Sequence, residues 1–191
     1  MKKKILTVVG TRPNFIKITQ FDRVFAQYPE EFEFRLLHTG QHYDARMSEI
    51  FFEQLQLREP DYYLGIGAGS PAAQMGQIMT ALSAVLDEWR PDLVMVPGDV
   101  NSTLAAALTA NKHNIRLAHL ESGLRSRDRS MPEEINRILT DEITDLCFVT
   151  EQSGLDHLAA EGKDPAGVHF VGNTMIDTLV AFDDAIQASP I

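Results

Sequence analysis

Charged side chains stand close behind several short apolar runs of the chain. Arg12, His42, Asp99 and Glu121 each come within a few residues of the end of such a run. If the runs are parallel strands, these side chains lie along one edge of a sheet, where such sheets bind ligands. An edge with a cation, carboxylates and glycines provides what a site for a charged small molecule needs. Each residue alone would be explained as a loop residue or helix cap, so their combination predicts the site.

A second set of charged residues lies in an arginine-rich stretch. Its arginines are Arg125, Arg127, Arg129 and Arg137. Arginine suits bidentate contacts with phosphate, so the stretch could hold a phosphate group. It could equally be a solvated loop whose arginines pair with neighbouring carboxylates. Glu133 follows Pro132 at the start of an expected helix, where a carboxylate also interacts favourably with the helix dipole.

The elements that must position these residues alternate between apolar strands and helices. Strands are expected at residues 5–9, 32–38, 62–64, 93–96, 117–120, 146–149 and 168–171. Helices are expected at residues 15–25, 45–55, 71–89, 102–112, 152–161 and 176–186, and another begins at residue 132. This alternation predicts an α/β fold with a doubly wound parallel sheet and right-handed crossovers.

Composition excludes several classes of protein. The chain has 191 residues and 21.3 kDa, enough for one domain and the start of another at about 100–200 residues per domain. Its net charge of −10 argues against nucleic-acid and acidic-membrane partners. The single cysteine, Cys147, excludes an internal disulfide and favours a reducing compartment. No apolar run approaches the ~18 residues of a membrane span, so a cytoplasmic location is predicted.

Nucleotide-phosphate and metal motifs are also missing from the sequence. The Walker pattern is absent, because Gly162-Lys163 lacks the required upstream glycine spacing. The dinucleotide fingerprint is absent after the first strand, and the glycine-rich stretch 65–70 only approaches it, so it is interpreted as a loop. His38 and His42 flank Gly40, which argues against a helical metal pair, and no Cys/His cluster exists. We therefore expect no bound metal and no nicotinamide cofactor.

Six segments in order along the chain resemble the non-hydrolysing UDP-N-acetylglucosamine 2-epimerases. They are Gly10-Thr11-Arg12-Pro13 with Lys17, Thr39-Gly40-Gln41-His42, Gly98-Asp99 with Ser102-Thr103, the run from His119 to Arg125, the run from Pro132 to Arg137, and Val171-Gly172-Asn173-Thr174 with Asp177. Each segment is a weak signal alone, but their order along nearly the whole chain is specific. The chain departs from the family pattern at Asn14, where glutamate is common, and at Ser122, where alanine is usual.

The resemblance implies one half of a GT-B-like architecture, in which two Rossmann-like domains face a cleft. Residues 1–170 would form the N-terminal Rossmann-like domain, and residues 171–191 the hinge and the start of a second domain. Because the family's second domain holds much of the UDP-binding surface, we expect this chain alone to be inactive. Family members are commonly homodimers, so a homodimer is expected for the full-length form.

The family reaction interconverts UDP-GlcNAc and UDP-ManNAc, and the resemblance implies no cofactor. A carbanion at C2 would have no adjacent carbonyl to stabilise it, and the resemblance implies that removal of the C2 proton is instead coupled to loss of UDP from C1. The resemblance implies that proton transfer falls to the carboxylates Asp99, Glu121 and Glu133. The substrate-binding residues that it implies are Arg12, Lys17, Gln41, His42, Arg125 and Arg137.

Three alternatives remain open from the sequence. A hydrolysing relative would release free ManNAc and UDP, and another relative would epimerise a different UDP-acetamido sugar. A non-catalytic nucleotide-sugar-binding or assembly module would keep the fold alone. Such a module has no need of three carboxylates together with Arg12.

Overall fold

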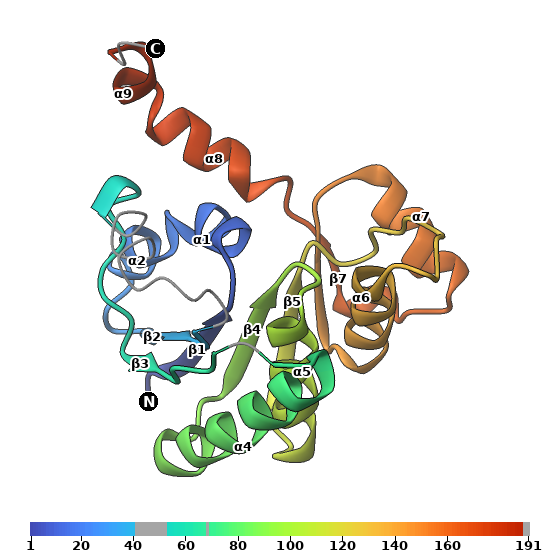
Figure 1. Cartoon of the computed structure of the whole chain (residues 1–191). Helices are drawn as coiled ribbons and strands as arrows, with labels where there is room; N and C mark the ends of the chain where they lie inside the picture. The colour runs from blue at the N-terminus through green and yellow to red at the C-terminus, as the bar shows by residue number, and fades with distance from the viewer. Residues whose placement is uncertain (41–52, 68, 189–191) are drawn as a thin grey trace.

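The computed structural model describes residues 1–40, 53–67 and 69–188. Its parallel sheet has the strand order β3-β2-β1-β4-β5-β6-β7 (Figure 1). The strands are β1 (Lys3–Val9), β2 (Phe32–His38), β3 (Tyr62–Tyr63), β4 (Leu93–Pro97), β5 (Arg116–Leu120), β6 (Leu146–Val149) and β7 (Val168–Phe170). The chain builds outward from β1 to β3, returns to the other side of β1, and builds outward again from β4 to β7. The predicted doubly wound sheet is confirmed, and its switch point lies between β1 and β4.

Helices connect the strands and cover both faces of the sheet (Figure 1). They are α1 (Arg12–Ile18), α2 (Phe21–Phe25), α4 (Pro71–Trp89), α5 (Asn101–Lys112), α6 (Pro132–Ile143), α7 (Gln152–Ala160), α8 (Thr174–Ala181) and α9 (Asp183–Gln187). A 3₁₀ turn at Pro165–Gly167 precedes β7. The helix expected at residues 71–89 matches α4 at both ends, and the Ser70 hydroxyl caps its first turn by accepting from the Ala73 N–H at 3.3 Å.

Two of the helices were predicted as continuous, but each is divided into two helices in the structure. The helix expected at residues 15–25 is divided at Thr19 into α1 and α2. This break lets Phe25 stack on Phe34 of β2, with ring centroids 4.5 Å apart. The helix expected at residues 176–186 is divided at Phe182, whose φ of −107° is not helical. Most of the helix expected at residues 45–55 lies outside the described residues.

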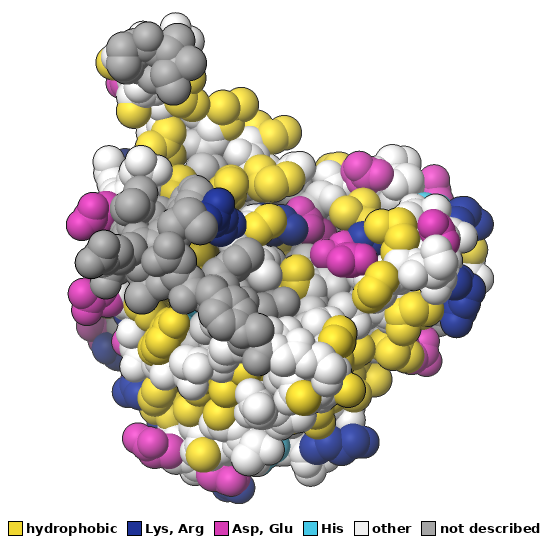
Figure 2. All heavy atoms as spheres, in the orientation of Figure 1, with side chains coloured by type: hydrophobic (Ala, Val, Ile, Leu, Met, Phe, Trp, Pro, Cys, Tyr) yellow, Lys and Arg dark blue, Asp and Glu magenta, His cyan; other side chains and the backbone are white. Residues whose placement is uncertain are grey.

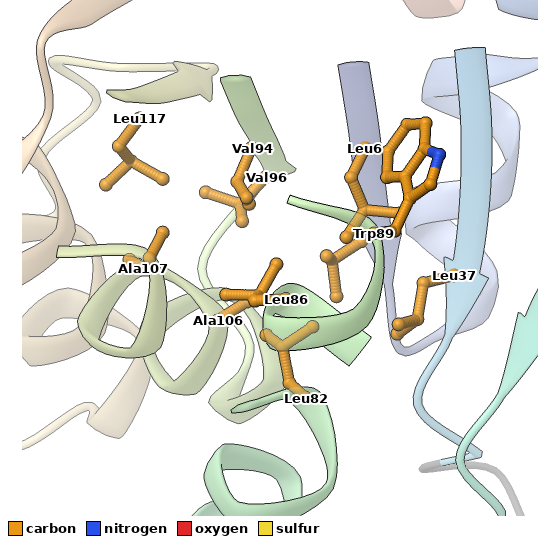
Figure 3. Packing of buried hydrophobic residues seen from close by; sticks show 12 residues of the cluster. Leu6, Leu37, Leu82, Leu86, Trp89, Val94, Val96, Ala106, Ala107 and Leu117 are labelled. Carbon is orange, nitrogen blue, oxygen red and sulfur yellow. The ribbon is translucent and has the colours of Figure 1, made fainter. Parts of the chain in front are cut away.

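The largest hydrophobic cluster joins the sheet to α4 and α5 (Figure 3). Strand residues such as Val94 and Val96 face Leu82 and Leu86 of α4, and all four are fully buried. Small residues of α5, including Ala106 and Ala107, let that helix approach the sheet closely. This packing holds β1, β4 and β5 in register, and so holds the loops that follow them.

We expect Leu86→Ala to lower the free energy of unfolding by about 3 kcal/mol, because it leaves a cavity in this cluster. Urea denaturation followed by circular dichroism measures the change. Leu139→Ala is the control, since Leu139 is 47 % exposed on α6, and it should change the stability by less than about 0.5 kcal/mol. Equal losses in both variants would contradict the assignment of Leu86 to the core.

The α8 segment projects from the body of the molecule and contacts α1 (Figure 1). The Thr178 hydroxyl donates to the carbonyl of Ile16 at 2.6 Å and lies 2.5 Å from the hydroxyl of Thr19. The other side of α8 exposes apolar residues, and Figure 2 shows hydrophobic side chains along this arm. Val180 of α8 is 69 % exposed. Among the described residues, no helix is both long and apolar enough to cross a membrane.

Candidate active site

Asn14 joins the ends of β1 and β4 at the switch point. Its Oδ1 accepts from the N–H groups of Gly10 at 3.1 Å and Thr11 at 3.2 Å. Its Nδ2 donates to the carbonyl of Pro97 at 3.2 Å. Asn14 is 2 % exposed. This residue, which departs from the family pattern, therefore forms a buried bridge between the loops that follow β1 and β4.

A buried ion pair crosses the switch point. Lys17 Nζ of α1 lies 2.5 Å from Oε2 of Glu121, which follows β5, and the two side chains are 10 % and 12 % exposed. Ion pairs this far from water interact strongly but also lose hydration, so each partner depends on the other. The pair sets a fixed cation and a fixed carboxylate side by side at the carboxyl edge of the sheet.

Gly98, which follows β4, makes room for this pair. Its φ of +69° lies in the left-handed region that favours glycine. A Cβ added there would lie 3.0 Å from Lys17 Nζ and 3.3 Å from Asn14 Nδ2. Close approach and backbone conformation therefore both require glycine.

We expect Gly98→Ala to destabilise the fold by about 1–2 kcal/mol, because alanine is strained at positive φ. Gly76→Ala is the matched control. Gly76 lies within α4 with no atom within 4 Å of an added Cβ, so this variant should stabilise the protein by about 0.5–1 kcal/mol. Thermal unfolding of both variants checks the opposite signs. A neutral Gly98→Ala variant would argue against the tight packing at the switch point.

Glu121 has a strained backbone. Its φ is +74° although it is not glycine, a conformation that costs on the order of 1–3 kcal/mol and that clusters at functional sites. The carbonyl of Phe148 in β6 accepts from the N–H groups of Glu121 at 3.0 Å and of Ser122 at 3.2 Å. These bonds hold the turn, and the turn directs the Glu121 carboxylate towards Lys17.

Arg137 of α6 brings a second carboxylate to the same edge. It donates to Asp99 Oδ2, and its other terminal nitrogen donates to Glu134 Oε2 at 2.9 Å. Burial lowers the pKa of Arg137, but its bonds to Asp99 and the charge of Glu134 outweigh that effect and leave the pKa raised. The guanidinium therefore stays charged and orients Asp99, whose side chain is 30 % exposed.

Glu134 anchors the arginine-rich loop. It is 1 % exposed, and it accepts from the backbone N–H groups of Ser126 at 2.9 Å and Arg127 at 2.8 Å. Burial alone would raise its pKa, but these N–H groups and the charge of Arg137 hold the pKa below its ordinary value. Glu134 is thus an ionised support for Arg137.

The sequence-predicted site residues have different positions in the structure. Lys17, Asp99, Glu121 and Arg137 gather at the carboxyl ends of β4 and β5, and Arg12 opens α1 beside them. Glu133 is exposed in the first turn of α6, next to Glu134. Gln41 and His42 lie outside the described residues. Figure 2 shows acidic and basic side chains gathered beneath the projecting α8 arm.

Arg125 is placed differently from the other predicted binding residues. Its side chain is only 4 % exposed and lies between Asp141, 2.7 Å away, and Glu161, 2.6 Å away. Burial lowers its pKa, but these two carboxylates outweigh that effect and raise it. Its guanidinium is paired with two carboxylates of the fold, and a substrate-binding role for Arg125 stays a prediction. The sequence analysis did not select Asp141 as a candidate residue. In the sequence it is only one more acidic residue in the helix expected from residue 132.

In the part of the chain that the structure describes, two hollows adjoin these elements. One of about 200 Å³ adjoins the ion pair, and its lining is Lys17, Gln20, Phe21, Val24, Phe25, Met95, Thr174 and Asp177. The other, of about 340 Å³, lies between α6, α7 and the loop before β7. Five of its lining residues are carboxylic acids, Asp141, Glu142, Asp145, Glu161 and Asp164. Such a lining repels an anionic ligand, so the smaller hollow beside Lys17 is the better candidate.

Comparison with known proteins agrees with this geometry. The model of the UDP-N-acetylglucosamine 2-epimerase family matches residues 26–191. The chain belongs to this family. It is 45 % identical over 177 residues to a UDP-N-acetylglucosamine 2-epimerase homolog of Methanococcus maripaludis, covering 93 % of this chain and 48 % of the relative. It is 44 % identical to a UDP-2,3-diacetamido-2,3-dideoxy-D-glucuronate 2-epimerase of Pseudomonas aeruginosa, covering 94 % of this chain and 51 % of the relative.

Solved structures of this epimerase family share the fold. The Methanocaldococcus jannaschii UDP-GlcNAc 2-epimerase in complex with UDP-GlcNAc and UDP has a TM-score of 0.92 and 40 % identity. The match covers 98 % of this chain and 51 % of that one. The chain spans about half the length of the relatives it matches. The shared fold confirms the predicted Rossmann-like α/β class.

Proposed function

We propose that this chain is the N-terminal half of an enzyme that interconverts UDP-GlcNAc and UDP-ManNAc. Two charged pairs at the switch point carry the proposal: Glu121 with Lys17, and Asp99 with Arg137. They supply two carboxylates and two cations at the sheet edge where ligands of such folds bind. Family membership and the similarity to an epimerase in complex with UDP-GlcNAc support the choice of substrate.

The reaction needs acid–base groups and an anion-binding environment. One carboxylate removes the C2 proton while the C1–oxygen bond to UDP breaks, which leaves 2-acetamidoglucal and UDP. Return of a proton to the other face of C2 and of the UDP oxygen to C1 gives the epimer. Asp99 and Glu121 are the acid–base candidates, with Glu133 as a third from the first turn of α6. Lys17, Arg12 and Arg137 supply positive charge for the departing diphosphate.

A second half is part of the proposal. The hollow beside Lys17 is about 200 Å³, below the ~300–1,000 Å³ usual for small-molecule sites. The relatives are about twice as long as this chain. We therefore propose that residues 1–170 form the first domain, that residues 171–191 begin the connection to a second one, and that the cleft closes only with that second half. The homodimer and the cytoplasmic location remain predictions.

A second substrate has specific support. The P. aeruginosa relative, named for a UDP-2,3-diacetamido-2,3-dideoxy-D-glucuronate substrate, is nearly as similar in sequence as the relative from M. maripaludis. That substrate carries a carboxylate, which the exposed arginines of the stretch, Arg127 and Arg129, would attract. Hydrolysis with release of free sugar is the remaining enzymatic alternative, and a non-catalytic binding module is the alternative outside enzymes.

Proton NMR of UDP-GlcNAc in D₂O tests the proposal. The chain alone should give no C2 deuterium and no UDP-ManNAc, whereas adding the C-terminal half of the M. jannaschii relative should give both. Free ManNAc and UDP would identify hydrolysis, and turnover of only the diacetamido-glucuronate substrate would identify the second candidate. Full turnover by the chain alone would contradict the need for a second half. Tight binding of each UDP-sugar with no exchange in the complemented protein would identify a binding module.

A further inference from the structure

His119 of β5 is a fully buried titratable residue that the proposed reaction does not use. Its Nε2 lies 2.7 Å from the carbonyl oxygen of Gly98. Its Nδ1 lies 2.6 Å from Oδ1 of Asp141 in α6. A carbonyl oxygen only accepts hydrogen bonds, so Nε2 carries a proton in this arrangement.

The environment of Asp141 determines the proton on the other nitrogen. Asp141 Oδ2 accepts from the N–H of Gly123 at 2.9 Å and from Arg125 Nη1 at 2.7 Å. A backbone N–H and a guanidinium only donate hydrogen bonds, so these two partners hold Asp141 as a carboxylate whatever the state of His119. An ionised carboxylate only accepts hydrogen bonds, so Nδ1 of His119 also carries a proton. The imidazole is then a cation.

The neighbouring charges support this state. Arg125 pairs with Glu161 as well as with Asp141, so positive and negative groups alternate from His119 to Glu161 and their formal charges cancel. Cys147 of β6 pairs with His119 in the sheet register, and burial and the charge of Asp141 raise the pKa of its thiol, which therefore stays neutral. Lys163 Nζ, which follows α7, donates to the backbone carbonyl of Asp141 at 2.5 Å.

The bond from His119 reaches the backbone of the candidate site. Gly98 is held through both of its peptide groups: its N–H donates to the carbonyl of Leu120 at 3.0 Å, and its carbonyl, which belongs to the peptide with Asp99, accepts from His119. Lys17 Nζ lies 3.0 Å from the position that a Cβ on Gly98 would take, and Asp99 is the next residue. Rotation of this peptide would move the Asp99 carboxylate away from Arg137.

We propose that His119 is a positioning residue, held as an imidazolium by Asp141, that fixes the Gly98 peptide and so places the carboxylate of Asp99. Its charge state and its effect on the Gly98 turn are properties of this chain. Its effect on turnover rests on the proposed function.

Nitrogen-15 NMR of the histidine-labelled chain at pH 7 tests the charge state. Both ring nitrogens of His119 should carry a proton, and His119→Gln assigns the signal by removing it. The exposed His169 gives the reference signal of a solvent-facing ring. In Asp141→Asn the side-chain amide can donate to Nδ1, so only Nε2 should stay protonated at pH 8.5. A single protonated nitrogen in the wild type at pH 7, or two in Asp141→Asn at pH 8.5, would overturn the imidazolium.

Amide hydrogen exchange tests the positioning role without any turnover. His119→Gln should raise the exchange rate at Gly98 by tenfold or more, whereas Asp141→Asn, which keeps the bond from Nε2, should raise it less. Unchanged exchange in a folded His119→Gln variant would overturn the role.

The complemented protein adds a kinetic readout. His119→Gln should lower kcat by up to about 10²-fold through misplacement of a reacting group, with little change in KM, and Asp141→Asn should recover part of the loss. An unchanged kcat in His119→Gln would overturn the effect on turnover. Failure of the wild type to turn over would reject the proposed function, and the two NMR measurements would still decide the state and role of His119.

Discussion

Asp99→Asn and Glu121→Gln should each lower the turnover of UDP-GlcNAc by about 10²–10⁴-fold in the complemented protein, the range for loss of a general acid or base. Each substitution keeps the size of the side chain and removes its ability to exchange a proton at neutral pH. Both carboxylates already have a cation that holds them in place, Arg137 for Asp99 and Lys17 for Glu121. Initial rates of UDP-ManNAc formation by NMR measure the loss, and deuterium incorporation at C2 reports the proton transfer separately.

Asp92→Asn is the matched control for the first variant. Asp92 precedes β4 whereas Asp99 follows it, and Asp92 pairs with Lys3 at the opposite edge of the sheet. It should retain wild-type turnover. Glu121→Gln also leaves Lys17 without its counter-charge in a largely buried place, so its fold must be checked by urea denaturation before its rate is interpreted.

The two variants can also separate the roles of the carboxylates. A variant that loses turnover but keeps C2 exchange retains the base and lacks a later step, such as protonation from the other face. Near wild-type rates for either variant would remove that carboxylate from the mechanism and leave Glu133 as the third candidate.

The sequence was sufficient to predict the sheet and the edge at which the candidate residues gather. The strand at 32–38 matches β2, and the strand at 146–149 matches β6. Short apolar strands ending at glycine leave few alternatives to a parallel sheet, and a parallel sheet places its loops on one edge. For that reason the sequence alone places Asp99 and Glu121 at the same edge of the sheet.

Side-chain partners could not be predicted in the same way. The adjacent acids Glu133 and Glu134 differ by one helical position, about 100° around α6, and only the packing of α6 against the arginine-rich loop determines which of them is buried. Arg125 and Arg137 illustrate the same limit. Arg137 pairs with Asp99 at the sheet edge, whereas Arg125 is buried between carboxylates of the fold, and phosphate binding by the stretch stays a prediction.

Helix breaks depend on contacts between distant segments. The apolar positions from Phe15 to Phe25 fit one helical stripe, yet the chain turns at Thr19. The Thr19 hydroxyl contacts Thr178 of α8, which is 159 positions away in sequence. A local pattern contains no information about such a partner, so tertiary packing decides where the helix ends.

Asp141→Ala should lower the free energy of unfolding at pH 7 by about 3–5 kcal/mol, the range for breaking a buried ion pair. The variant leaves His119 without a counter-charge and the Gly123 N–H without an acceptor. Asp156→Ala, which removes an exposed carboxylate from α7, is the control and should cost less than about 0.5 kcal/mol. Urea denaturation at pH 7 measures both, and equal effects would contradict the buried network.

The pH dependence of the same variant gives an independent check. The pKa of Asp141 is about 2 in the folded chain against 3.8 ordinarily, so the unfolded chain takes up the proton first as the pH falls. The stability contributed by this carboxylate is therefore complete above about pH 4 and is lost as the pH falls towards 2, by about 2 kcal/mol in all. The difference in stability between the wild type and Asp141→Ala should shrink over this range. A difference that stays constant from pH 5 to pH 2 would mean that Asp141 titrates alike in both states, and would contradict the charged contacts with His119 and Arg125.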